Sequence, residues 1–221
     1  MALDRASELE RPRLAAQRDA LDDAELLKLP TWADLDVTAE FVGVDLAQLE
    51  VQRSRLVDCR FTGAQLHHCT LTDVVFERCE FSGVSFEETR FTRVEFRDCR
   101  MSGAQFGLAR LKDVAFNGCK LDGAGFRMAR AERLHADDCV LRAADFYSAE
   151  LVRSRLTRCD LTDVDFSSAK TIALAINGST LDAIRGAASL AGAHIDATQL
   201  VPLGLAMVAA LGVHIDNEPD D

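Results

Sequence analysis

The sequence has no excess of basic residues. Its 25 lysines and arginines are outnumbered by 36 aspartates and glutamates, which gives a formal net charge of −11 at pH 7. Because contact with phosphates needs clustered lysine and arginine side chains, we expect no direct binding of nucleic acid. A basic protein partner, or a protein surface that normally receives DNA, stays compatible with so acidic a chain.

Long apolar runs are also missing. The longest extends from Leu200 to Val213 and is interrupted by Pro202, so it is shorter than the about 20 residues that a membrane-spanning helix needs. The first residues show no basic segment followed by an apolar one, and we therefore expect no signal peptide. The seven cysteines of such a chain are expected to be reduced thiols. Together these features predict a cytoplasmic protein with no membrane partner.

Motifs of catalysis are absent as well. The sequence contains no glycine-rich phosphate-binding loop, no nucleophile elbow and no paired carboxylates with supporting residues. Its composition nevertheless indicates a folded chain, because 48% of the residues are hydrophobic, as in ordinary globular proteins. We therefore expect a folded protein that is not an enzyme and binds no cofactor.

What the sequence does contain is a repeat of five residues. From Ala39 to Leu181 every fifth residue is mostly Leu or Phe, and a small residue stands two positions before it. The repeat centres fall at 41, 46, 51 and onward to 181 without an insertion. A helix returns a side chain to one face after about 3.6 residues and a strand after about 2, so neither explains this period. A coil that turns a corner every five residues does.

Three columns of identical residues set the length of one coil. Six cysteines share the small position and follow one another at intervals of 20: Cys59, Cys79, Cys99, Cys119, Cys139 and Cys159. Five centres repeat at the same interval: Phe86, Phe106, Phe126, Phe146 and Phe166. Five glycines do so at a corner: Gly43, Gly63, Gly83, Gly103 and Gly123. One coil therefore takes 20 residues in four sides, with glycine where the backbone needs angles that other residues avoid.

The repeat tract resembles the pentapeptide-repeat proteins, whose pattern is A(D/N)LXX. The segments 144–148 (ADFYS) and 164–168 (VDFSS) match this pattern nearly letter for letter. The resemblance implies an all-β solenoid, a right-handed quadrilateral β-helix of about seven 20-residue coils. At about 4.8 Å for each stacked strand, seven coils give a rod about 34 Å long.

The pattern divides the chain into four segments. They are an N-terminal cap segment (1–38), the repeat β-helix (39–181), an irregular final coil (182–195), and a C-terminal capping and dimerisation helix with an acidic tail (196–221). Within the first segment we predict a helix over residues 14–29, and Trp32 is expected to cover the open end of the solenoid.

The C-terminal segment has the signals of a helix. Asp196 and Gln199 form a plausible capping box, Pro202 suits the first turn, and Gly212 suits the end. Six apolar residues leave the helix apolar on nearly all sides: Leu200, Leu203, Leu205, Met207, Val208 and Leu211. One face is expected to close the rod and the other to join a second subunit, which predicts a homodimer. This ending resembles the mycobacterial gyrase-protecting (fluoroquinolone-resistance) branch of the family, whose terminal helices join two rods.

The known period assigns each charge to one side of the rod. The side centred on 46, 66, 86 and onward carries five acids against one base, Arg127, a net charge of −4. We predict that these acids form an interaction face: Asp45, Glu87, Glu88, Asp145 and Asp165. Leu108, Met128 and Tyr147 are predicted to point outward on the same side, as a contact patch or as scattered apolar surface.

The next side, centred on 51, 71, 91 and onward, has the opposite sign. Nine bases stand there against five acids, a net charge of +4. The bases are Arg53, Arg90, Arg93, Arg110, Lys112, Arg130, Arg133, Arg153 and Lys170. The rod is therefore predicted to be electrically two-sided.

Three hypotheses follow for the function. The first is a non-enzymatic scaffold that acts through protein–protein interaction. The second comes from the resemblance, because gyrase-protecting members mimic duplex DNA and bind DNA gyrase or other type II topoisomerases. The third is a metal or redox protein, but zinc ligands converge on a point while a column of cysteines presents a line. The run His67, His68, Cys69 also fails as a metal site, since Cys69 is predicted to point inward and the histidines outward.

Overall fold

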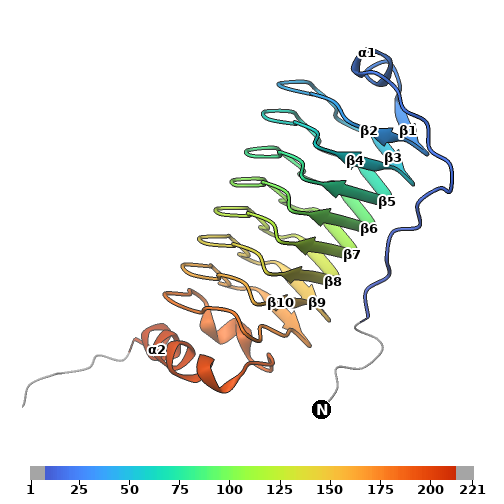
Figure 1. Cartoon of the computed structure of the whole chain (residues 1–221). Coiled ribbons are helices and arrows are strands. Elements are labelled where there is room, and N and C mark those ends of the chain that lie inside the picture. Colours follow the sequence, from blue (N-terminus) through green and yellow to red (C-terminus); the bar gives the residue numbers. More distant parts are fainter. Residues whose placement is uncertain (1–7, 213–221) are drawn as a thin grey trace, which may run out of the picture.

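Each coil of the protein closes after 20 residues, and the coils stack into a rod (Figure 1). The computed structural model describes residues 8–212. A coil has four sides, because four separate points of it pair in parallel with the coil that follows. In one coil these pairs are Arg60 with Glu80, Gln65 with Ser85, Thr70 with Arg90, and Val75 with Glu95. The predicted right-handed quadrilateral β-helix of about seven coils is confirmed.

Two adjacent sides carry the regular strands, and the other two pair through isolated bridges. In the middle of the rod one strand runs around the corner between these sides: β5 (Thr70–Glu77), β6 (Arg90–Arg97), β7 (Arg110–Asn117) and β8 (Arg130–Asp137). Towards the ends the strand is divided or shortened: β1 (Thr31–Ala33), β2 (Asp36–Val37), β3 (Glu50–Gln52), β4 (Arg55–Val57), β9 (Glu150–Val152), β10 (Arg155–Thr157) and β11 (Lys170–Ile172). The first strand thus begins at Thr31, before the repeat tract, and a parallel bridge joins Asp19 to Leu35 still earlier in the chain.

Inward-facing columns of side chains form the core. Consecutive rings in the predicted column of Phe86 to Phe166 lie 4.7 to 5.4 Å apart, centroid to centroid. Burying one such ring contributes about 1.5 to 3 kcal/mol, whereas fixing five backbone residues costs about 5 to 10 kcal/mol. A single coil is therefore unstable alone, and each coil is stabilised by the two that it contacts.

The corners of the coils hold the backbone in the left-handed region. The predicted glycine column lies at such a corner, with φ between 63° and 70°. At another corner the same conformation is taken by charged residues, among them Asp73 (φ 59°), Arg93 (φ 52°) and Asp113 (φ 57°). The corners therefore carry rows of charged groups along the rod, although Asp73 and Asp113 are themselves buried.

The N-terminal end of the rod is covered by Trp32, as predicted. Its side chain is 1% exposed and its ring lies 5.0 Å from that of Phe41. The indole Nε1 donates a hydrogen bond of 3.0 Å to the carbonyl of Leu26, a fully buried residue at the end of α1 (Asp23–Leu26).

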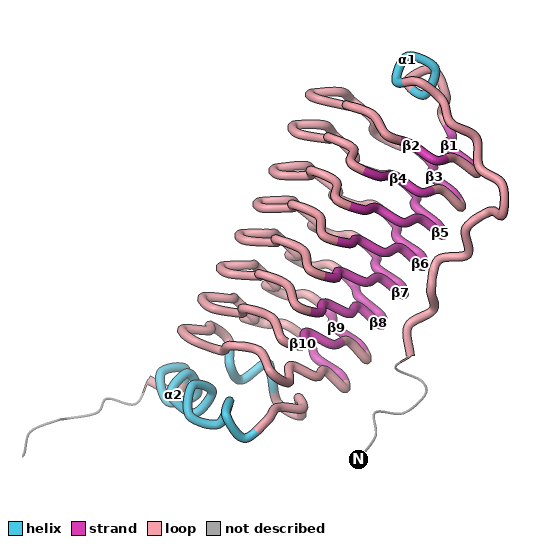
Figure 2. Tube along the Cα trace, in the orientation of Figure 1, coloured by secondary structure: helices cyan, strands magenta, loops and turns pink. Residues whose placement is uncertain are grey.

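The prediction of a helix over residues 14–29 is wrong. Only α1 is helical in this part of the chain, and residues 8–22 run as an extended segment beside the strands (Figure 2). The apolar stripe that suggested the helix is weak, and Leu27 is 46% exposed. Four backbone N–H groups of the segment donate instead to residues of the coils, those of Glu10, Arg13, Ala15 and Asp19.

At the C-terminal end the repeat shortens by one residue. Ala175 pairs with His194, 19 residues further on, whereas the isolated bridges from Glu40 with Arg60 to Asp165 with Arg185 join residues that are 20 apart. Two 3-10 helices (Ala187–Leu190 and Ala197–Gln199) lead into α2 (Leu200–Ala210). No helix in residues 8–212 has the length and apolar character that a membrane span requires.

The predicted capping residues join α2 to the rod. The backbone N–H of Asp196 donates to Oε1 of Gln199 at 2.9 Å. The amide Nε2 of the buried Gln199 donates to the carbonyls of Ile176 and Ser179, both at 2.6 Å. Gly212, with φ of 66°, follows the last turn. These bonds fix the start of α2 against the last coil.

Candidate interaction surfaces

The extended N-terminal segment forms a strap across the coils. We define the strap as residues 8–19. The backbone N–H of Glu10 donates to Oδ1 of Asp113 at 3.1 Å, and that of Arg13 donates to Oδ1 of Asp73 at 2.9 Å. The step of three residues from Glu10 to Arg13 therefore spans two coils, from the coil of Asp113 to the coil of Asp73. Two coils rise about 9.6 Å, which matches about 3.3 Å for each residue of an extended chain.

Three acidic side chains are buried beside the strap. Asp73, Glu95 and Asp113 are 6%, 4% and 1% exposed. The carboxylate of Glu95 accepts hydrogen bonds from Arg11 of the strap at 3.0 Å and from Arg97 at 2.8 Å. Burying a carboxylate without hydrogen-bond donors costs free energy. These donors therefore explain why acidic side chains can be buried under the strap.

Alternating charges run along the corner that the strap crosses. Each carboxylate there accepts two hydrogen bonds, between 2.6 and 2.8 Å, from the arginine on the adjacent coil: Asp34 with Arg53, Asp73 with Arg93, and Asp113 with Arg133. Bidentate pairs of this kind are the stronger class of ion pair. Arg53, Arg93 and Arg133 belong to the predicted basic side. Asp73 and Asp113 alternate with them at intervals of 20, a pattern that is compatible with these pairs but does not specify them.

The buried acids of this corner are ionised. Burial by itself raises the pKa of Asp113, but hydrogen bonds from Arg133 and from the Glu10 N–H outweigh it and hold the pKa below its usual range. The same balance lowers the pKa of Asp73. At neutral pH both groups are therefore carboxylates and act only as acceptors.

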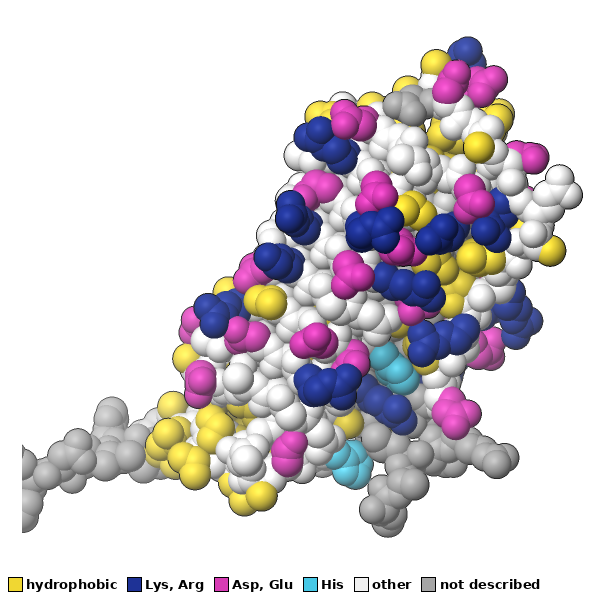
Figure 3. Space-filling view, viewed as in Figure 1, with side chains coloured by type: hydrophobic (Ala, Val, Ile, Leu, Met, Phe, Trp, Pro, Cys, Tyr) yellow, Lys and Arg dark blue, Asp and Glu magenta, His cyan; other side chains and the backbone are white. Residues whose placement is uncertain are grey.

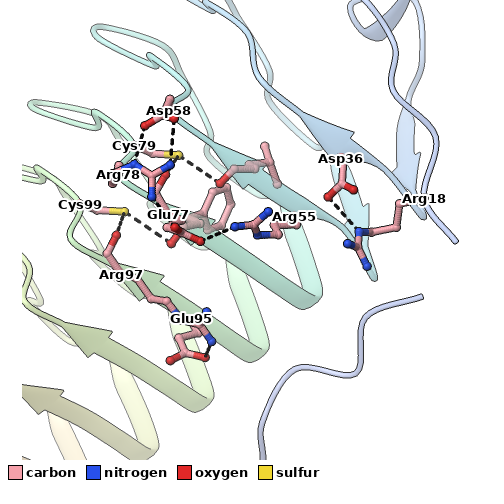
Figure 4. Close-up of polar contacts among 12 residues, drawn as sticks. Arg18, Asp36, Arg55, Asp58, Glu77, Arg78, Cys79, Glu95, Arg97 and Cys99 are labelled. Atoms are coloured by element: carbon pink, nitrogen blue, oxygen red, sulfur yellow. Dashed lines mark hydrogen bonds and ion pairs between the residues drawn. The ribbon is translucent and has the colours of Figure 1, made fainter. Parts of the chain in front are cut away.

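A second row of ion pairs lies on the side that carries β4 (Figure 4). The guanidinium of Arg78 donates to both carboxylate oxygens of Asp58, at 2.8 and 2.9 Å, and also contacts Glu77. Here both partners are half-exposed, with 49% and 54% of the side chains accessible. Acidic and basic side chains consequently alternate over the visible face of the rod (Figure 3).

The five acids of the predicted interaction face are spread over the length of the rod. Asp145 and Asp165 stand in register on adjacent coils, whereas Asp45 lies near the opposite end. Two of them are neutralised by arginine: Arg127 lies 2.7 Å from Asp145, and Arg185 lies 3.5 Å from Asp165. Arg185 falls beyond the repeat tract, so counting charges within the tract omitted it.

Glu87 and Glu88, the other two predicted acids, are exposed neighbours in one coil. Glu88 lies 3.6 Å from Nδ1 of His68 on the preceding coil. The structure places Asp145 beside Asp165 and Glu87 beside Glu88, whereas Asp45 lies apart from both pairs. A single face formed by all five acids therefore stays a prediction.

The basic side divides into paired and unpaired residues. Five of its nine bases form ion pairs: Arg53, Arg93, Arg133, Arg153 and Lys170. The other four form no ion pair within residues 8–212: Arg90, Arg110, Lys112 and Arg130. The positive charge predicted for this side is thus concentrated on one part of it.

Helix α2 presents apolar side chains at the end of the rod. Leu203 packs against the core together with Ala206. Leu200, Leu205 and Leu211 are 62%, 59% and 77% exposed. Figure 3 shows hydrophobic side chains gathered at the lower end, over α2. Of the remaining predicted dimer residues, Met207 is exposed and Val208 is half-buried.

The cysteine column is part of the packed core. All seven cysteines are buried free thiols. Each column thiol contacts a carbonyl of the preceding coil, as Cys79 does with Leu56 at 3.4 Å, and Ser179 makes the same bond at 2.8 Å. Burial raises the pKa of the separate Cys69 thiol to about 11. Within the described residues no three His, Cys, Asp or Glu side chains could hold one metal ion.

The parallel pairing of four-sided coils defines the protein as a β-solenoid. Its outer side chains provide rows of charge, and α2 adds an apolar end. Residues 38–106 and 109–185 match the family model described as Pentapeptide repeat region. This match spans more than half of the 221 residues, and the chain belongs to the pentapeptide-repeat family.

Solved structures with a related chain path have low identity. Full-length QnrB1, described as a plasmid-mediated fluoroquinolone resistance protein, is 19% identical over 88% of this chain and 95% of its own, with a TM-score of 0.45. The pentapeptide repeat protein Rfr23 from the cyanobacterium Cyanothece 51142 is 11% identical over 50% and 87%, with a TM-score of 0.43. No curated protein sequence matches the chain. At these values the likenesses carry no argument about function.

Proposed function

We propose that the protein is a non-enzymatic interaction scaffold, in which two rods join through α2 and bind a protein partner on their outer surface. The observation that carries this proposal is the set of exposed leucines on α2, at the end of a rod whose other large side chains are mostly buried. Exposed apolar patches of this kind mark protein contacts. We further propose a cytoplasmic location, since the seven cysteines are free thiols.

Sedimentation velocity tests the homodimer. The wild-type chain is expected to sediment as a dimer, and Leu205→Glu as a folded monomer, because Leu205 is exposed and its substitution leaves the rod intact. Leu203→Glu is the contrasting variant, since this residue packs against the core and its loss should lower the melting temperature. A wild-type chain that sediments as a monomer at micromolar concentration would remove the dimer.

The second candidate function is mimicry of DNA toward DNA gyrase. The uninterrupted rod and the net charge of −11 favour it. The neutralisation of Asp145 by Arg127 and of Asp165 by Arg185 disfavours it, because a DNA mimic needs unpaired acids along its length.

A supercoiling assay separates the two candidates. DNA gyrase is titrated with the protein, with and without a fluoroquinolone. Inhibition of supercoiling, or protection from the drug, at micromolar concentration would establish the mimic. Supercoiling that the protein leaves unchanged, both with and without the fluoroquinolone, would exclude the mimic and leave the scaffold as the proposed function.

A further inference from the structure

Three unpaired arginines stand in register on adjacent strands. Arg90 of β6 is the strand partner of Arg110 of β7, which in turn is the partner of Arg130 of β8. All three side chains are exposed, and adjacent strands lie about 4.8 Å apart. Arg100 likewise forms no ion pair within residues 8–212, and it lies on a different side of the coil. We define these three residues as the arginine row.

The arginine row departs from the charge pattern of the rest of the rod. Like charges directly opposite one another in a ladder are destabilising. At the neighbouring corner the rod avoids this by alternating signs, as in the pair of Asp113 and Arg133. The next rung beyond the row is Glu150, but its carboxylate accepts a hydrogen bond from Lys170 at 3.0 Å. The row therefore keeps a local positive charge that its neighbours do not neutralise.

A groove of about 610 Å³ follows the row. All three arginines line it, together with Leu108 and Met128. These two apolar side chains are 52% and 49% exposed, and they stand at equivalent positions of consecutive coils. The groove thus combines a line of positive charge with a parallel line of apolar groups.

We propose that this groove binds an acidic amphipathic helix of a partner protein. Its carboxylates would pair with the arginine row, and its apolar stripe would cover Leu108 and Met128. The spacing fits, because successive turns of a helix rise about 5.4 Å against about 4.8 Å for successive coils. Over three arginines the mismatch is about 1.2 Å, which the long arginine side chains accommodate.

The charge of the whole chain selects a protein ligand over a nucleic acid. Nucleic-acid-binding domains are basic as a whole, whereas this chain has a net charge of −11. Glu88 also lines the groove and would repel a continuous phosphate backbone. An amphipathic helix carries its acids on one stripe, so its carboxylates can pair with the arginine row without facing Glu88. The proposal rests on the scaffold function and names the chemistry of its partner.

Fluorescence anisotropy at low salt tests the proposal. The probe is a fluorescein-labelled helical peptide with glutamates every three to four residues along one face and a leucine after each glutamate. Arg110→Glu is expected to weaken binding about tenfold or more. Arg100→Glu is the matched control, an equally unpaired arginine on another side, and should bind as the wild type does. A peptide of the same composition with scrambled order should bind weakly.

The outcomes are distinct. Equal loss in Arg110→Glu and Arg100→Glu, or no binding of the ordered peptide, would overturn the proposal. Tighter binding of a single-stranded oligonucleotide of the same charge would overturn it in favour of a nucleic acid. Sedimentation of Arg110→Glu should still show the dimer, because α2 is distant in the chain from the row. Loss of peptide binding with the dimer retained therefore tests the groove separately from the scaffold function.

Discussion

The carboxylate of Asp113 accepts two hydrogen bonds from the guanidinium of Arg133, at 2.6 and 2.8 Å, although the residues are 20 positions apart. It also accepts the backbone N–H of Glu10. One buried side chain therefore connects two consecutive coils and the strap. The same arrangement recurs at Asp73, which bonds Arg93 and the N–H of Arg13.

Asp113→Ala should destabilise the rod strongly. Asp113 is 1% exposed and Arg133 is 13% exposed, so the substitution leaves a buried guanidinium without its main partner. Breaking such a pair costs about 3 to 5 kcal/mol. Asp58→Ala is the matched control, because its pair with Arg78 has the same geometry but is half-exposed, and a much smaller loss is expected. Urea denaturation followed by circular dichroism measures both; equal midpoints for the two variants would contradict the prediction.

Acid should release the strap before it unfolds the core. The folded-state pKa values of Asp73 and Asp113 lie below their usual range, so both groups bind protons more weakly when folded. Their stabilising contribution is complete above about pH 4 and is lost as the pH falls through the lower folded values. Hydrogen exchange at the amides of Glu10 and Arg13 should therefore accelerate below about pH 4, beyond the intrinsic effect of pH. In Asp73→Asn/Asp113→Asn this additional acceleration should be missing.

Phe106→Ala should lower stability by about 3 to 5 kcal/mol. The ring of Phe106 is fully buried and stacks at 5.1 Å on Phe86 and at 4.7 Å on Phe126. Phe106→Asp should prevent folding, because it places a carboxylate in the middle of the column. Gln105→Ala, at the exposed neighbouring position, serves as the control. A melting curve of Phe106→Asp that equals the wild-type curve would refute the cooperative core.

Cys99→Ser should leave the fold intact. Ser179 occupies the equivalent position and makes the same contact to the preceding coil, so a hydroxyl is compatible with the column. The native thiols should also resist a thiol reagent at pH 7, since they are buried and the pKa of Cys69 is about 11. Labelling in the native state and in urea measures this, together with the metal content of the purified protein. Bound metal that disappears in Cys99→Ser would instead support a metal site.

The repeat predicted the inside of the rod better than its outside. The period of five places Phe106 and Cys99 inward, and both are buried. It also assigns Asp113 and Arg133 to one side, but it does not show that they bond or that the strap covers them. The helix predicted over 14–29 failed for a related reason, because local apolar spacing competed with hydrogen bonds to coils far along the chain.

The sequence by itself determined the coil length, the four sides and the columns of the core, because each coil repeats the same short-range constraint on size and direction. Only the tertiary structure decided which charges are neutralised, where the strap runs and which leucines of α2 face outward. These features depend on contacts between segments that share no period, such as Glu10 with Asp113. Their energies are settled by burial and by the partners available in three dimensions, and no pattern along the chain encodes them.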